Sequence, residues 1–195
     1  MREAVIVSTA RTPIGKAFRG AFNDTQAQEM AGHAIAEAVK RSKVSKEEID
    51  DVIIGAAGQQ GSQQGNIARQ SLLRAGLPVS VAGMSLDRQC ASGMMAIATA
   101  AKEITEDGMT ITVGGGVESV SLVRNENFRM DRARDPWLEE NIPALYMTMI
   151  ETAENVAKRY GISREAQDEY SLQSQMRTAK AQQNGYMDKE IVPLK

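Results

Sequence analysis

Short apolar runs rich in Val and Ile alternate along this chain with longer stretches whose apolar residues repeat at helical spacing. A β-branched run of about five residues is typical of a buried strand, and spacings of three and four residues mark one face of a helix. Strands that alternate with helices predict an α/β layered unit with a mostly parallel sheet. The predicted strands are residues 3–8, 51–55, 79–86 and 109–113, and the predicted helices cover residues 27–39, 66–75 and 92–105.

Turn and capping signals between these elements support the same order. Arg11 to Gly15 carries the turn signals of Pro and Gly, and Ser45 with Glu48 forms a capping-box pattern. The strand at 109–113 is expected to close with Gly114-Gly115-Gly116. This triplet lacks the spacing of a phosphate-binding loop, so we interpret it as close backbone packing.

The pattern changes near Val120. Residues 121–145 contain charges, Asn, Pro and the only Trp without a clear period, which predicts a long loop. Two helices are expected after it, the first from about Met149 to Tyr160. Gly161 would end that helix and Ser163 would begin the next. We therefore divide the chain into a core unit of residues 1–120 and a partial loop domain of residues 121–195.

The composition excludes several classes of protein. Hydrophobic residues make up 42% and charged residues 25%, which suits a globular core. The net charge of -2 gives no field that would attract nucleic acid. No apolar run approaches the roughly 20 residues that span a bilayer. A single Cys excludes an internal disulfide, and we expect a cytoplasmic protein.

That single cysteine, Cys90, is the strongest candidate for chemistry. A strand is predicted to end just before it and a helix to begin just after it. The positive end of a helix dipole favours a thiolate, and small neighbours from Ala91 to Gly93 would let a substrate approach the sulfur. Free Cys is also among the most buried residue types, so local sequence leaves open a reactive or an inert thiol.

Several segments together resemble the thiolase family, and they occur in that family's order. They are Ala10-Arg11-Thr12-Pro13-Ile14-Gly15, Gln89-Cys90-Ala91-Ser92-Gly93, Gly114-Gly115-Gly116-Val117-Glu118-Ser119, Thr152-Ala153-Glu154-Asn155 with Tyr160-Gly161-Ile162-Ser163, and Glu190-Ile191-Val192-Pro193. The resemblance extends from about Val5 to Pro193.

The resemblance implies a thiolase-like layered α/β fold, of which this chain is the N-terminal αβα half with a mostly parallel, mixed sheet. It implies ping-pong acyl transfer between a 3-ketoacyl-CoA or acetyl-CoA and CoA, with coenzyme A as substrate and product and no covalently bound cofactor or metal. Cys90 would be the nucleophile, and its backbone amide would donate to an oxyanion. Met149 would line the acyl pocket, although Ile150 beside it leaves the acyl chain length open.

Thiolases also use a His and a second Cys from their C-terminal half, and this chain has one of each residue type in total. His33 matches no family motif, and we interpret it as a structural helix residue. The chain is therefore expected to need a C-terminal thiolase partner half, to be inactive alone, and to assemble as a homodimer or homotetramer. Phe128 and Trp137 are candidate contacts in the assembly. Two alternatives remain: a related condensing enzyme that uses the same Cys, and a non-catalytic dimerising half.

Overall fold

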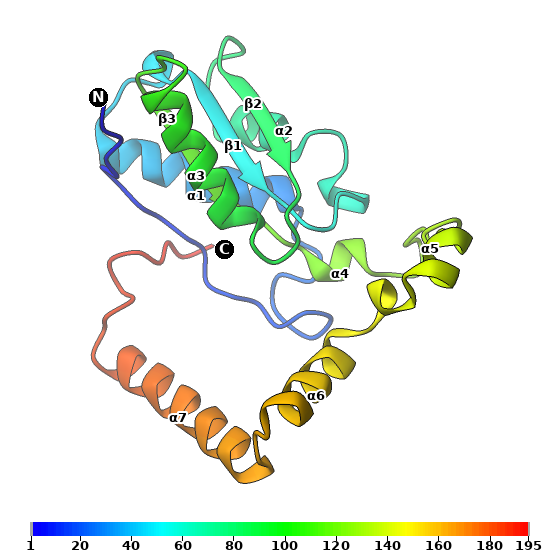
Figure 1. The fold of residues 1–195 in the computed structure, drawn as a ribbon. Coiled ribbons are helices and arrows are strands. Elements are labelled where there is room, and N and C mark those ends of the chain that lie inside the picture. Colours follow the sequence, from blue (N-terminus) through cyan, green and yellow to red (C-terminus); the bar gives the residue numbers. More distant parts are fainter. Residues whose placement is uncertain (1, 195) are drawn as a thin grey trace. The chain divides into compact units, whose positions relative to one another are not determined.

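The computed structural model describes residues 2–194 and divides them into two compact units. The first contains the residues up to Phe128 together with the segment from Glu190, and the second is Arg129–Lys189. Figure 1 shows the strands, all of them in the first unit.

The first unit is built on a parallel sheet. Its three strands are β1 (Asp51–Gly55), β2 (Ala82–Leu86) and β3 (Thr112–Gly116), in the order β2-β1-β3. Each residue of β1 pairs in parallel with one residue of each neighbour, from Asp51 to Gly55. The predicted α/β class and parallel sheet are confirmed, and β1 has the bounds that the sequence predicted.

Helices cover both faces of this sheet. Figure 1 shows α3 (Ser92–Thr105) in front of the strands, with α1 (Ala27–Ser42) and α2 (Ile67–Arg74) behind them. The alternation of side chains along β1 explains the layers, because successive residues of a strand point to opposite faces. Val52 and Ile54 join the core beneath α1 and α2, while Ile53 packs with Ala96 and Ala100 of α3.

The predicted strand at residues 3–8 is wrong: this segment is extended but forms no strand. A strand needs backbone partners on a neighbour, and in residues 2–194 none pairs with this segment. Its apolar side chains are consequently exposed, with Val5 at 72% and Ile6 at 76%.

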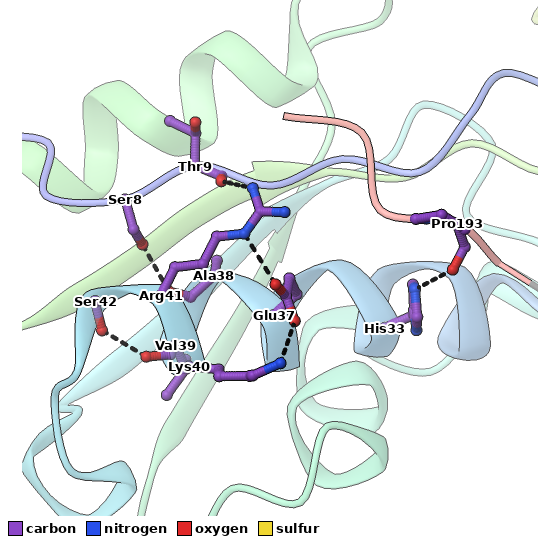
Figure 2. Close-up of polar contacts among 10 residues, drawn as sticks. All are labelled: Ser8, Thr9, His33, Glu37, Ala38, Val39, Lys40, Arg41, Ser42 and Pro193. Atoms are coloured by element: carbon purple, nitrogen blue, oxygen red, sulfur yellow. Dashed lines mark hydrogen bonds and ion pairs between the residues drawn. The ribbon is translucent and has the colours of Figure 1, made fainter. Parts of the chain in front are cut away.

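Side chains attach this N-terminal segment to α1 instead, as Figure 2 shows. The Ser8 hydroxyl donates to the Ala38 carbonyl at 2.6 Å, and the Arg41 guanidinium donates to the Thr9 carbonyl at 2.9 Å. Glu37 accepts from Arg41 at 3.0 Å, which holds the guanidinium in place. These contacts hold Ser8 and Thr9 against α1 without a sheet ladder.

Other element boundaries also differ from the predictions. β2 begins at Ala82 rather than Val79, and β3 includes the three glycines that were expected to close it. The supposed loop of residues 121–145 contains the end of α4 (Val120–Val123), α5 (Pro136–Asn141) and a 3₁₀ turn, η3 (Pro143–Tyr146). α5 forms because Asp135 accepts from the first amides and Pro136 stands at the helix start. Two further 3₁₀ turns are η1 (Lys46–Glu48), with the expected capping box, and η2 (Gly61–Gln63).

The second unit ends in the two predicted helices, α6 (Met149–Tyr160) and α7 (Arg164–Gln183). Gly161 adopts a left-handed conformation at the end of α6, and Ser163 accepts from the Ala166 amide at the start of α7, as predicted. Neither helix has a buried residue. None of the helices among residues 2–194 combines the length and apolar character needed to cross a membrane.

Candidate active site

Cys90 lies in the turn that joins β2 to α3. The turn is tight because Gln89 takes a left-handed conformation, with φ of 51°. Ser92 closes it: its hydroxyl donates to the Gln89 carbonyl at 2.6 Å and accepts from the Arg88 amide at 2.9 Å. The predicted strand before Cys90 and helix after it are confirmed, with Ser92 as the first helical residue.

The thiol of Cys90 is exposed. Cys90 is therefore not buried among the described residues, and its reactivity stays a prediction. Carboxyl ends of parallel strands meet at one edge of a sheet, and loops at that edge commonly form ligand sites. The turn that follows β2 places Cys90 at this edge.

Glycines bring the start of α3 against the ends of the other two strands. A Cβ on Gly55, the last residue of β1, would lie 2.2 Å from the carbonyl carbon of Ser92. A Cβ on Gly116, the last residue of β3, would lie 3.0 Å from the Cα of Gly93. At Gly55 a Cβ has no room, and at Gly116 it would be tighter than most real contacts. The interpretation of the glycine triplet as close packing beside the Cys90 segment is confirmed for Gly116, while Gly114 packs against the middle of α3 and Gly115 makes only an ordinary contact with Ile54.

The loops that follow β1 and β3 are tied together by Glu118 and Gln63. The Glu118 carboxylate accepts from the amide of Ala57 at 2.9 Å, the amide of Gly58 at 3.3 Å, and the Gln63 side chain at 2.8 Å. Gln63, only 1% exposed, donates to the Gly58 carbonyl at 2.7 Å and accepts from the Ser119 amide. No local pattern points to Gln63, which stands in a loop rich in Gln and Gly.

A cavity of about 260 Å³ opens beside these loops. One wall is the N-terminal segment from Ala10 to Ala17, and another runs from Gly116 to Ser121. Arg11 on the first wall forms a salt bridge of 3.0 Å with Glu190, so its charge is already paired. Two of the segments on which the family resemblance depends therefore line the same cavity.

Two further residues singled out in the sequence stand on the helices α1 and α6. His33 is on α1, where its Nε2 lies 3.0 Å from the Pro193 carbonyl (Figure 2); a carbonyl only accepts, so the ring donates. This contact fits the structural role predicted for His33. Met149 begins α6 in the second unit and is 73% exposed, and its role in substrate binding stays a prediction.

Acidic residues gather at the opposite edge of the sheet, where the strands begin. Burial raises the pKa of Asp51, the first residue of β1, and burial also raises the pKa of Glu103 on α3. The pKa of Asp50 is lowered because its carboxylate accepts from the amides of Ile111 and Thr110. No group of three or more His, Cys, Asp or Glu side chains in the described part of the chain could hold a metal ion.

Comparison with known proteins gives one consistent family. The family model described as "Thiolase, N-terminal domain" matches residues 4–195. Among curated proteins, the 3-ketoacyl-CoA thiolase of Bacillus subtilis (strain 168) is 40% identical over 196 residues, which are 100% of this chain and 49% of that protein. The acetyl-CoA acetyltransferase of Cupriavidus necator is also 40% identical, over 204 residues that cover 100% of this chain and 51% of that protein.

A solved structure agrees with the sequence relatives. The crystal structure of the Bacillus anthracis acetyl-CoA acetyltransferase superposes with a TM-score of 0.83 at 37% sequence identity, covering 98% of this chain and 50% of that chain. The chain thus spans about half the length of the relatives that it matches.

Proposed function

The chain belongs to the thiolase family, and we propose that the protein that carries it transfers acyl groups between coenzyme A thioesters, with Cys90 as the nucleophile. The substrates would be a 3-ketoacyl-CoA or acetyl-CoA on one side and CoA or acetyl-CoA on the other. Coenzyme A would act as substrate and product, with no covalently bound cofactor.

The position of Cys90 is the observation that carries this proposal. Its thiol is exposed, it stands in the turn between β2 and α3, and α3 begins two residues later. Free amides and the positive end of a helix dipole stabilise a thiolate near a helix start, and the thiolate is the reactive form of Cys. The small residues Ala91 and Gly93 leave room for a thioester or ketone carbon to reach the sulfur.

The reaction would proceed in two halves. In the cleavage direction the Cys90 sulfur attacks the 3-keto carbon, and the bond between Cα and Cβ breaks. The electron pair of that bond goes to the departing acetyl-CoA, which takes up a proton, and an acyl-Cys90 thioester remains. The thiolate of a second CoA then attacks this thioester and releases Cys90. Such a covalent intermediate replaces one difficult step by two easier ones.

The proton transfers need groups that these residues do not bring to Cys90. A base must generate the thiolate and an acid must protonate the leaving carbanion. His33, the one His in the sequence, lies on α1 and is hydrogen-bonded to the Pro193 carbonyl. Because the relatives are about twice as long as this chain, we place both groups in a C-terminal half that folds with it.

Steady-state kinetics of the complete protein would test the function. We expect CoA-dependent cleavage of acetoacetyl-CoA, which is measured as the loss of the 3-ketothioester absorbance. Cys90→Ala should abolish the reaction while circular dichroism and thermal unfolding stay unchanged. Undiminished cleavage by Cys90→Ala would contradict the proposal.

Met149 is proposed to line the acyl pocket of the complete protein. Its exposure at the start of α6 leaves its side chain available for such a contact. A smaller side chain there should favour longer acyl chains. Competing substrates of increasing chain length would test this, and an unchanged preference in Met149→Ala would argue against it.

A homodimer or homotetramer is the proposed assembly, with residues 1–120 as a core half and 121–195 as part of a loop domain. Exposed apolar side chains support association: Met94 on α3 is 77% exposed and Trp137 on α5 is 62% exposed. Light scattering would show a monomer at micromolar concentration if this proposal is wrong.

A further inference from the structure

Glu118 makes an unusual set of contacts for an exposed carboxylate. Both of its oxygens accept hydrogen bonds: Oε2 from the Ala57 amide, and Oε1 from the Gly58 amide and the Gln63 side chain. A carboxylate that accepts from several fixed donors forms strong, well-oriented bonds. These contacts join residues that are separated by 55 to 61 positions in the sequence.

Gln63 extends the contact into the interior. Its side chain is buried, and it bonds both to Glu118 and to the amide of the next residue, Ser119. Its Nε2 also donates to the Gly58 carbonyl at 2.7 Å. The two side chains therefore bond backbone atoms of three residues, Ala57, Gly58 and Ser119, and so fix the loop after β1 to the loop after β3.

The strand ends held by this network support the start of α3. Val117, beside Glu118, donates its amide to the Gly55 carbonyl at 3.0 Å. Ser92 packs against Gly55 without room for a Cβ, and Gly93 packs tightly against Gly116. A shift of either strand end would therefore be passed to Ser92, whose hydroxyl closes the Cys90 turn.

We propose that Glu118, held by Gln63, is a positioning residue that keeps the Cys90 turn in its reactive geometry by fixing the strand ends beneath α3. This inference rests on the proposed function of Cys90 as nucleophile and adds a residue to that site. Glu118 acts through the backbone of Gly55 and Gly116 and does not itself touch the reacting atoms.

Because both oxygens of Glu118 accept hydrogen bonds, Glu118→Gln is the substitution that tests the network. In Glu118→Gln one acceptor oxygen becomes an NH₂ group, which would face donors that it cannot satisfy. An amide of the same shape therefore breaks the network although it preserves packing. Glu118→Asp retains two acceptor oxygens on a shorter side chain and should restore part of the function.

The first measurement is the rate of Cys90 alkylation by iodoacetamide in the complete protein, as a function of pH. We expect Glu118→Gln to react about tenfold more slowly near neutral pH, because a displaced turn would remove the sulfur from the free amides of the helix start, which favour the reactive thiolate. Glu118→Asp should fall between the two proteins.

Steady-state cleavage of acetoacetyl-CoA is the second measurement. We expect kcat to fall about tenfold in Glu118→Gln and KM to change less than about twofold, the pattern of a group that supports the transition state rather than binding. Glu37→Gln is the charge-matched control, since Glu37 is likewise a hydrogen-bonded carboxylate, paired with Lys40 and Arg41, but lies on α1. Ile67→Val, which removes a buried methyl group, controls for a general loss of stability.

The outcomes separate this proposal from the proposed function. Wild-type alkylation and kinetics in Glu118→Gln would overturn the positioning role even if Cys90 proves to be the nucleophile. Alkylation needs no acyl transfer, so it remains informative if the proposed function fails. Gln63→Met, similar in shape and unable to join Glu118 to Ser119, should reproduce the slower alkylation. If neither variant folds, the network is only structural and the proposal is overturned.

Discussion

A methyl group added at Gly55 should displace the Cys90 turn, because it would collide with the start of α3. The Cβ of Gly55→Ala would lie 2.2 Å from the carbonyl carbon and oxygen of Ser92 and 2.7 Å from the Gly93 nitrogen. Ordinary contact begins at 3.4 Å, so the start of α3 must retreat by about 1.2 Å, the difference between 3.4 and 2.2. The obstacle is backbone, which cannot swing aside as a flexible side chain would.

Both stability and reactivity should respond. Overpacking of this kind typically costs about 1–3 kcal/mol of the free energy of unfolding. A displacement near 1 Å at a reacting group can cost about 10²-fold in rate. We therefore expect Gly55→Ala to lower the rate of acyl transfer by roughly one to two orders of magnitude. Cys90 alkylation should also slow, because the displaced helix start would no longer offer its free amides to the thiolate.

Gly115→Ala is the matched control, because its Cβ would meet Ile54 Cδ1 at 3.7 Å, an ordinary contact. It should alter neither rate. Thermal unfolding and time-resolved alkylation of the complete protein would be compared for both variants. Equal Cys90 rates in Gly55→Ala and Gly115→Ala would refute the argument that glycine packing sets the position of the turn.

Three further predictions concern single residues. Glu103→Met should raise the free energy of unfolding at pH 7 by about 1–3 kcal/mol, since one carboxyl oxygen of Glu103 is buried without a hydrogen-bond partner among the described residues. Burial raises the pKa of Glu103, so the folded state holds this proton more tightly than the unfolded state. The stability of the unsubstituted protein should therefore fall as the pH rises above 4.5, and at pH 4 the gain from Glu103→Met, measured by thermal unfolding, should be smaller. Gln89→Gly should preserve the rate of Cys90 alkylation while Gln89→Val slows it, because a β-branched residue at φ of 51° costs roughly 1–2 kcal/mol; equal rates would contradict this. Gly161→Ala should destabilise the α6 terminus by about 1 kcal/mol, seen as faster local hydrogen exchange, since the cost at φ of 63° is conformational and no atom lies within 4 Å of the new Cβ.

Local patterns predicted the elements whose formation depends on their own residues. The bounds of α3 from Ser92 to Thr105 follow from helical periodicity, and the end of α6 follows from Gly161. The run from Glu3 to Ser8 has equally strong local character but forms no strand, because a strand also requires a partner that no local pattern reveals. The sequence predicts that the strand ends before Gly114, because glycine usually weakens a strand. β3 nevertheless continues to Gly116, because the backbone of α3 lies against Gly114 and Gly116.

The candidate site was predictable in part. The Cys90 turn could be located because strand, small residues and helix are adjacent in sequence. Gln63 could not be found, since its role arises from contacts with Gly58 and with Glu118, 55 residues away, within a loop of unremarkable polar residues. Whether Met149 lines the acyl pocket stays a prediction, because it lies in the other unit.

Trapping of the acyl-enzyme tests the central claim most directly. The complete protein would be mixed with acetoacetyl-CoA without free CoA, quenched in acid, digested and examined by mass spectrometry. We predict one acetyl group on the peptide that contains Cys90, removed when CoA is added before the quench. An acetyl group on another residue, or turnover without any modified Cys90 peptide, would contradict the account.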